Sequence, residues 1–333
     1  MTDKRNKKPT YQPADKENWQ GRAKSDSKKE SEYWFEEIQL IGIDKLSEIK
    51  SSEKCKFSLI GYLCDEGVRR NQGRIGAKSG PDAIRERLAK IAIHFSDKEI
   101  FDLGNVICPD QDMEACQKAL AVTVKKILQN NTIPIVAGGG HDVAYGHFKG
   151  IEQAVEKDKR IGIINFDAHF DLRPIDKLPN SGTPFNQIFS EFSKHRVDYL
   201  VVGIQQQGNT KELFEIAKKY DVKFIPYDKC TTLETDFNDL KKQLDKFIST
   251  CDVLYISVDM DGFSSAYAPG VSAPSPLGFT PDFFFKTMLH ILASQKVISF
   301  DIAELNPKFD IDNHTASLAA RIVDFIVTNW QLR

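Results

Sequence analysis

From Phe57 onward, short runs rich in Val, Ile and Phe alternate with longer stretches in which apolar residues recur at helical spacing. The short runs predict eight strands, at 56–63, 99–106, 132–138, 160–167, 197–204, 222–227, 253–259 and 297–304. The longer stretches predict helices at 81–92, 112–129, 142–157, 209–220, 236–249, 280–293 and 315–329. This alternation indicates an α/β domain with a mostly parallel sheet covered on both faces. Periodicity alone leaves an open sheet and a closed eight-stranded barrel equally compatible with the pattern.

The N-terminal segment has a different pattern. Residues 1–32 contain no Leu, Ile, Val or Phe, and 15 of the 32 are charged. Such a segment cannot bury enough apolar surface to offset the entropy lost on ordering. We therefore expect a polar tail at 1–32, mobile at its start, followed by a single domain at 33–333. Tyr11, Pro13 and Trp19 are the residues that would anchor 11–22 against that domain.

Composition excludes several classes of protein. The 333 residues include 45 Lys plus Arg and 47 Asp plus Glu, so there is no basic excess for binding nucleic acid. No apolar run is long enough for a membrane span, and the N-terminus is too polar for a signal peptide. The six cysteines contain no CxxC pair, so neither a disulfide framework nor a zinc framework is expected. As free, buried small hydrophobes they suit a reducing cytoplasm, and we expect a cytoplasmic protein with neither nucleic-acid nor membrane partners.

Four predicted strands end in unusual polar clusters. These are Gly139-Gly140-His141-Asp142, Asp167-Ala168-His169-Phe170-Asp171, Asp259-Met260-Asp261, and a strand that carries Asp301 and ends on Glu304. The carboxyl ends of parallel strands share one edge of the sheet, so residues more than a hundred positions apart can meet there.

The spacing within these clusters predicts a metal site. In an extended chain Asp167, His169 and Asp171 would project from one face, and so would Asp259 and Asp261. Converging carboxylates repel one another unless a positive charge lies among them. Four carboxylates with His141 and His169 balance two divalent cations, and this ligand set favours manganese, magnesium or iron over a thiolate-type zinc site. One such cluster alone is more often loop capping or solvated polar surface, whereas several at one sheet edge favour the metal site.

Four motifs resemble those of the arginase/agmatinase superfamily of ureohydrolases. They are GGGHD at 138–142, NFDAHFDLR at 165–173, SVDMDGF at 257–263 and DIAELNP at 301–307, and their order matches across nearly all of 56–333. The resemblance implies a three-layer α/β/α sandwich with a mostly parallel eight-stranded sheet, not a barrel. It also implies that 33–333 is one arginase-like catalytic domain.

The resemblance further implies two manganese(II) ions per chain. By motif position, His141 and Asp171 would bind one ion, and His169 and Asp261 the other. Asp167 and Asp259 would bridge both. A hydroxide held between the ions would attack the amidine or guanidine carbon.

Two of the motif residues have catalytic roles by the same resemblance. Asp261 would transfer a proton to the leaving amine, and Glu304 would pair with the cationic nitrogens of the substrate.

Other segments resemble the formimidoylglutamase branch of the superfamily. They are YQPADKENWQGR at 11–22, CDEGVRRNQGRIGAKSGP at 64–81, GIQQQGNTKELF at 203–214 and PGVSAPSPLG at 269–278. This branch hydrolyses N-formimidoyl-L-glutamate to L-glutamate and formamide in histidine degradation. Its substrate carries two carboxylates, for which the resemblance implies Arg173, Arg69, Arg70 and Asn71 as binding residues. NSGTPF at 180–185 lacks the His that arginases and agmatinases generally carry there.

Two alternatives remain at this point. One is a guanidino hydrolase of arginase or agmatinase type that releases urea. The other is a non-catalytic protein that binds a small anion, although the complete set of candidate ligands argues against it. The resemblance also suggests a homo-oligomer. Gly262, where relatives usually have a bulkier apolar residue, either reshapes the pocket or eases the loop.

Overall fold

All eight strands predicted from the sequence are present in the computed structural model, which describes residues 10–21, 32–50, 52–192 and 196–331. They are β3 (Cys55–Leu63), β4 (Lys98–Ile107), β5 (Ile133–Ala137), β6 (Ile161–Phe166), β7 (Val197–Ile204), β8 (Lys223–Pro226), β9 (Val253–Asp259) and β10 (Val297–Ala303). Each lies within one or two residues of its predicted bounds.

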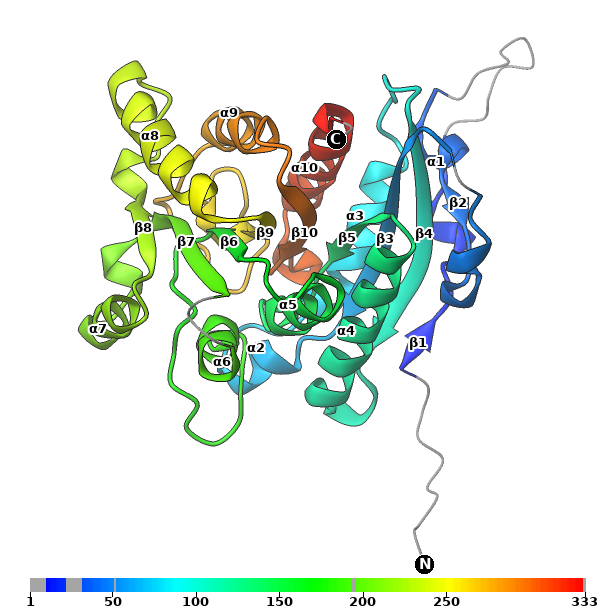
Figure 1. Ribbon diagram of the computed structural model, residues 1–333. Helices are drawn as coiled ribbons and strands as arrows, with labels where there is room; N and C mark the ends of the chain where they lie inside the picture. The colour runs from blue at the N-terminus through cyan, green and yellow to red at the C-terminus, as the bar shows by residue number, and fades with distance from the viewer. Residues whose placement is uncertain (1–9, 22–31, 51, 193–195, 332–333) are drawn as a thin grey trace, which may run out of the picture.

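The strands form one open sheet in the order β1-β4-β3-β5-β10-β9-β6-β7-β8, with β2 also paired to β4. The eight predicted strands all pair in parallel. Because β8 and the β1/β2 side form separate edges, the sheet is not a barrel, and the prediction of a sandwich is confirmed (Figure 1).

Two further strands were not predicted. β1 (Tyr11–Gln12) pairs antiparallel and β2 (Gln39–Leu40) pairs parallel with β4, so the sheet of the described residues has ten strands instead of eight. Each is only two residues long and carries no apolar run, so no periodic signal marks it in the sequence.

Helices cover both faces of the sheet (Figure 1). They are α1 (Trp34–Glu37), α2 (Glu66–Arg70), α3 (Gly80–Leu88), α4 (Met113–Gln129), α5 (Val143–Ala154), α6 (Pro184–Glu191), α7 (Lys211–Lys219), α8 (Glu234–Thr250), α9 (Pro281–Leu292) and α10 (His314–Asn329). The seven predicted helices are confirmed, whereas α1, α2 and α6 are too short for a helical repeat to stand out in the sequence.

Two hydrophobic cores account for the three layers. One core joins a face of the sheet to apolar residues of α3, α8, α9 and α10. The other joins the opposite face to α4, α5, α6 and α7. Local signals fix several helix starts: the Asp112 side chain caps α4, and Thr210 and Thr280 cap α7 and α9. No helix among the described residues is both long and apolar enough to span a bilayer.

Part of the N-terminal segment packs on the body. The Tyr11 hydroxyl donates to the Leu103 carbonyl at 2.7 Å, and the Trp19 indole donates to Asp102 at 2.7 Å. Asp102 is fully buried and also accepts two bonds from Arg85, so the indole joins a buried ion pair. The expected mobile start of the tail, residues 1–9, lies outside the described residues.

The order of the central strands positions the polar clusters. β5, β10, β9 and β6 are neighbours in the middle of the sheet, and all run in the same direction. Their carboxyl ends carry His141, Glu304, the pair Asp259 and Asp261, and the run 167–171 respectively. Four segments scattered over the chain therefore converge on one short stretch of the sheet edge.

Candidate metal centre

The four strand ends enclose a small pocket of about 90 Å³. Its lining includes five of the six predicted metal ligands and the predicted catalytic residue Glu304: His141, His169, Asp171, Asp259, Asp261 and Glu304. The sixth predicted ligand, Asp167, is fully buried beside them. The structure thus brings together every residue for which the sequence predicted a metal-binding role.

The same local turn shapes two of the clusters. Asp167 Oδ1 accepts a hydrogen bond from the His169 amide at 2.7 Å, and Asp259 Oδ1 accepts one from the Asp261 amide at 2.8 Å. In each case one carboxylate oxygen closes a turn onto the backbone two residues ahead, and the other oxygen lies within 3.2 Å of His141 Nδ1. The prediction that these residues alternate on an extended strand was wrong, because β6 ends at Phe166 and Met260–Gly262 is a 3-10 helix.

Asp171 and Glu304 have left-handed backbone conformations, with φ of +48° and +65°. Such values are unfavourable for residues with a side chain and occur where surrounding contacts enforce them. At Glu304 the contact is a hydrogen bond from its amide to the Gly139 carbonyl at 2.8 Å. This turn directs the Glu304 side chain back toward the end of β5, where Oε1 accepts from the His141 amide at 2.9 Å.

The His141 ring is the centre of one ligand group. Its Nδ1 lies 3.2 Å from Asp167 Oδ2, 2.9 Å from Asp171 Oδ2 and 3.0 Å from Asp259 Oδ2. Despite these distances, Nδ1 has no hydrogen-bond partner among the described residues. The four side chains therefore point at a common centre rather than at one another.

A second ligand group adjoins the first. His169 Nδ1 lies 3.2 Å from Asp261 Oδ2 and 3.6 Å from Asp167 Oδ1. Asp167 belongs to both groups through its two oxygens, whereas Asp259 belongs only to the group around His141. Asp167 thus has the position of a bridging ligand, and a bridging role for Asp259 stays a prediction.

Ser257 fixes the tautomer of His141. The Ser257 hydroxyl donates to Asp301 Oδ1 at 2.7 Å, so it can only accept from His141 Nε2, 2.9 Å away. A neutral His141 therefore carries its hydrogen on Nε2 and directs the lone pair of Nδ1 at the three carboxylates. This is the arrangement of a metal-binding imidazole whose other nitrogen is oriented by a hydrogen-bond partner.

The residues that orient the ligands were missed by the sequence interpretation. Besides Ser257, Asn165 donates to Asp167 Oδ2 at 2.9 Å and to the Tyr199 hydroxyl at 3.0 Å. Both lie two residues before a predicted ligand on a buried strand, at 257 and 165. A polar residue in an otherwise apolar central strand was the available signal.

The electrostatics require a cation. Burial raises the pKa of Asp259 well above its usual value, and the charges of Asp261 and Asp167 add to the effect. Burial lowers the pKa of His141, yet the three carboxylates within 3.2 Å of its Nδ1 outweigh burial, and the pKa lies well above its usual value. The cluster thus takes up positive charge, either as protons or as metal.

The donor set fits a pair of divalent ions. Oxygen and nitrogen ligands about 2.1 Å from an octahedral ion lie roughly 3 Å apart, which is the spacing around His141 Nδ1. Carboxylates with imidazole suit manganese, magnesium or iron, and none of the six ligands is a thiolate. Four carboxylates also balance the charge of two such ions.

Two oxygens at the site remain available for a substrate. Asp261 Oδ1 and Glu304 Oε2 are buried and have no hydrogen-bond partner within the described part of the chain. Burial raises the pKa of Glu304 to about 8, and the nearby Asp261 charge contributes. A cationic group in the pocket would pair with these oxygens and favour their ionised forms.

Arg173 and Asn71 lie at the mouth of the pocket. Arg173 Nη1 donates to Asn71 Oδ1 at 3.2 Å, and Asn71 donates to the Ser181 hydroxyl at 3.1 Å. Arg173 and Asn71 line both the metal pocket and an adjoining cavity of about 730 Å³ that leads to the surface. The exposed guanidinium of Arg173 is positioned to meet an anionic part of a ligand.

Arg69 and Arg70 have other partners. Arg69 forms two bonds to Glu66, both 2.6 Å long, and lines a separate cavity that contains none of the six predicted ligands. Arg70 borders the outer cavity, yet it binds both Glu66 and Glu114. Glu66 pairs with both guanidiniums and Glu114 with that of Arg70, so a substrate-binding role for Arg69 and Arg70 stays a prediction.

Gly262 packs behind the site and is not part of the pocket lining. A Cβ atom at this position would lie 2.7 Å from Cε1 of Phe279 and 3.0 Å from the Cα of Asp167. The absence of a side chain therefore lets the loop after β9 approach the backbone of the shared ligand. This answers the question that the sequence left open: the glycine permits close packing and does not enlarge the pocket.

Replacing the shared ligand is expected to cost more metal than replacing a ligand of one group. We predict that Asp167→Ala lowers the metal content from about two ions per chain to fewer than one, whereas Asp171→Ala keeps the ion at His169. Elemental analysis of the purified proteins measures both, and Asp176→Ala, an exposed acid outside the groups, is the control. Two ions retained in Asp167→Ala would contradict the shared position.

The close packing around Gly262 predicts how a side chain there would change the free energy of unfolding. Gly262→Ala should destabilise the protein by about 1–3 kcal/mol, because the new methyl group overlaps a core ring and the backbone of residue 167. Denaturant unfolding measures the change. In a Phe279→Leu background the same substitution should cost less, and an equal cost in both backgrounds would show that the ring is not what opposes the methyl group.

Comparisons with known proteins agree with this geometry. The model of the Arginase family matches residues 55–328. A formimidoylglutamase of Geobacillus sp. (strain WCH70) is 41% identical over 313 residues, covering 93% of this chain and 94% of the relative. One from Legionella pneumophila (strain Lens) is 40% identical over 321 residues, covering 94% and 96%.

Solved structures give the same result for the fold. Formimidoylglutamase from Bacillus subtilis subsp. subtilis str. 168 matches with a TM-score of 0.76 at 22% identity, covering 94% of this chain and 97% of that one. Trypanosoma cruzi formiminoglutamase, solved with Mn²⁺, matches with a TM-score of 0.73 at 25% identity, covering 87% and 98%. The family match, the close relatives and the converging Asp and His side chains together establish that this chain belongs to the arginase family.

Proposed function

We propose that the chain hydrolyses N-formimidoyl-L-glutamate to L-glutamate and formamide, a step of histidine degradation. The observation that carries the proposal is the pair of ligand groups sharing Asp167, at the floor of a pocket with Arg173 and Asn71 at its mouth. Relatives about 40% identical over more than nine-tenths of the chain carry the name formimidoylglutamase, which supports the same reaction.

Two manganese(II) ions are the proposed cofactors. One would be held by His141, Asp167, Asp171 and Asp259, and the other by Asp167, His169 and Asp261. When bound, such ions supply Lewis-acid charge and lower the pKa of water toward neutrality. Manganese is supported by the oxygen-rich ligand set and by the Trypanosoma cruzi relative solved with Mn²⁺.

Glu304 and Asp261 would handle the cationic end of the substrate. The free Oε2 of Glu304 faces the pocket while Oε1 is fixed by the His141 amide, so this carboxylate can accept N–H bonds from a formamidinium group. The unpartnered Oδ1 of Asp261 is available to carry a proton to the leaving amine. Burial of both groups strengthens these interactions.

Arg173 and Asn71 would bind the glutamate end. A guanidinium and an amide side by side provide several donors for carboxylate oxygens. The Arg173 side chain passes over Gly182, where a Cβ would lie only 2.9 Å from Arg173 Cδ. Ser181 and Gly182 thus support this side of the pocket, where arginases generally carry a His.

We also propose a cellular compartment and an assembly state for the enzyme. All six cysteines are free thiols, which is typical of a reducing compartment, so we infer a cytoplasmic enzyme of histidine degradation. A homo-oligomer without nucleic-acid or membrane partners is inferred from the family analogy and the near-neutral charge.

The products distinguish the proposed reaction from a guanidino hydrolase. Enzyme reconstituted with Mn²⁺ should convert N-formimidoyl-L-glutamate and water into equal amounts of L-glutamate and formamide, and should lose activity with a chelator. Arginine and agmatine are the comparison substrates. Faster urea release from either would overturn the assignment, and no product from any of the three would return the protein to the anion-binding alternative.

Arg173 is expected to act on the substrate and not on the metals. Arg173→Met should lower kcat/KM for N-formimidoyl-L-glutamate roughly 10- to 150-fold, because a charged hydrogen-bond donor is lost. This corresponds to a loss of about 1.5–3 kcal/mol of transition-state stabilisation. The kcat/KM of Arg173→Lys should lie between those of Arg173→Met and the wild type, since lysine keeps the charge but cannot form two parallel hydrogen bonds to a carboxylate.

Two controls accompany the Arg173 variants. Formamidine, which has no carboxylate, should be hydrolysed equally by all of them, and Lys177→Met removes a nearby charge from the same cavity. Equal losses on both substrates would mean that Arg173 acts on the metal site through its neighbour Asp171.

A further inference from the structure

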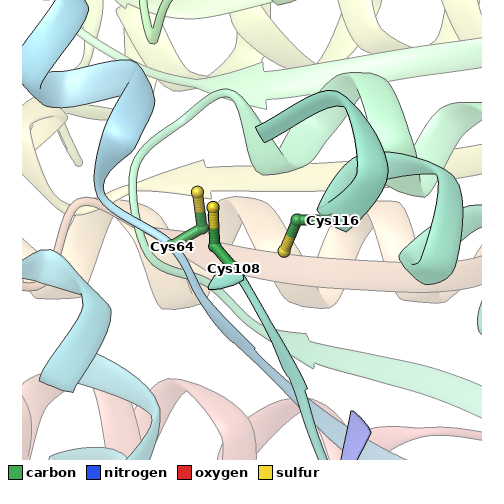
Figure 2. A group of neighbouring side chains, drawn as sticks. All are labelled: Cys64, Cys108 and Cys116. Carbon is green, nitrogen blue, oxygen red and sulfur yellow. The ribbon is translucent and has the colours of Figure 1, made fainter. Parts of the chain in front are cut away.

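Three cysteines far apart in the sequence converge outside the Asp and His centre. Cys64 follows β3, Cys108 follows β4, and Cys116 lies in the first turns of α4. Their three sulfur atoms lie within 4.8 Å of one another. In Figure 2 the side chains of Cys64 and Cys108 lie side by side with their sulfurs pointing the same way, and Cys116 approaches them from the helix.

We propose that Cys64, Cys108 and Cys116 form a binding site for one thiophilic metal ion, such as Zn²⁺. This site is separate from the Asp and His ligands and does not depend on the proposed hydrolase function. The spacings of 44 and 8 residues between these cysteines match no zinc motif, so this site was not predicted from the sequence.

The geometry needs little adjustment. Zinc–thiolate bonds are about 2.3 Å long, so three sulfurs around one ion lie about 3.8–4.0 Å apart. The three sulfurs lie within 4.8 Å of one another, so each pair must move closer by at most about 1 Å. Side-chain rotation at the end of two strands and the start of a helix can supply this movement without breaking the sheet.

Cys108 is the member of the three whose pKa is lowered by its neighbours. Hydrogen bonding from the Cys116 and Cys64 thiols lowers the pKa of Cys108 to about 4. The thiolate is the form that binds metal, and Cys108 is the partly exposed member of the three. Cys64 and Cys116 are almost fully buried, and burial contributes to raising the pKa of each, so they would release protons only as the ion binds.

An ion can reach the sulfurs from outside. Cys64 and Cys108 both line a cavity of about 630 Å³ that is open to solvent. Lys78 and Lys308 also line it, and their charges would offset the net negative charge of an ion bound by three thiolates. A water molecule from this cavity would complete four-coordination.

Ligand chemistry separates the two centres. Thiolates select zinc and copper(I), whereas carboxylates with imidazole favour manganese and magnesium. A protein loaded with Mn²⁺ at the Asp and His residues should therefore still bind a soft ion at the cysteines. A result that excludes one of the two metal sites would therefore not exclude the other.

Cobalt(II) is the probe that tests the proposal, because only thiolate ligands give it a sulfur-to-metal charge-transfer absorption. Reduced, full-length protein preloaded with Mn²⁺ is titrated with Co²⁺ and then with Zn²⁺. We expect the absorption to saturate at one equivalent and Zn²⁺ to abolish it. Cys108→Ser and Cys116→Ser should each weaken binding at least about tenfold, since even residues outside the ligand set change affinity by that much.

Cys230→Ser is the matched control. Cys230 is 5% exposed, lies elsewhere in the fold and should leave the absorption unchanged. Cys108 is only partly buried, so its variant remains informative if Cys116→Ser fails to fold. The proposal is overturned if the wild-type protein gives no charge-transfer absorption, or if Cys108→Ser binds Co²⁺ as tightly as the wild type.

Discussion

The structure depends on one electrostatic constraint, the convergence of four aspartates and two histidines at a buried sheet edge. Three carboxylate oxygens lie within 3.2 Å of Nδ1 of His141, and Ser257 keeps the hydrogen of the neutral ring on the opposite nitrogen. Lone pairs and negative charges at these distances repel strongly when water is excluded. The site is stable only with positive charge at its centre. The four positive charges of two divalent ions balance the four negative charges of the carboxylates.

The fold brings these side chains together with local backbone turns at the ends of rigid central strands. Four neighbouring parallel strands fix where the predicted ligands begin, and similar aspartate turns at Asp167 and Asp259 hold these two carboxylates at the site. Left-handed backbones at Asp171 and Glu304 complete the set. Such conformations cost roughly 1–3 kcal/mol each and persist where the surroundings enforce them, as they do beside the sheet edge. The substrate would meet ligands held in place before it arrives.

Much of this architecture could be predicted from the sequence, because strands and long helices carry a period that is visible locally. The candidate ligands were visible too, since carboxylates and histidines at the ends of apolar runs are unusual. The neighbour order β5-β10-β9-β6 depends on pairing between distant segments, which no local pattern encodes. For the same reason Glu114, the partner of Arg70, and the convergence of three cysteines were not foreseen. The aspartate turns were mistaken for extended strand because both give an i, i+2 spacing.

Electron paramagnetic resonance of the protein loaded with Mn²⁺ tests whether two metal ions share the Asp167 carboxylate. Two manganese ions bridged by one carboxylate are close enough for their spins to couple. We expect the spectrum of an exchange-coupled pair in the wild-type protein once two equivalents are bound, and the spectrum of isolated ions when Asp167 is replaced. A wild-type spectrum of isolated Mn²⁺ at full loading would contradict a shared ligand.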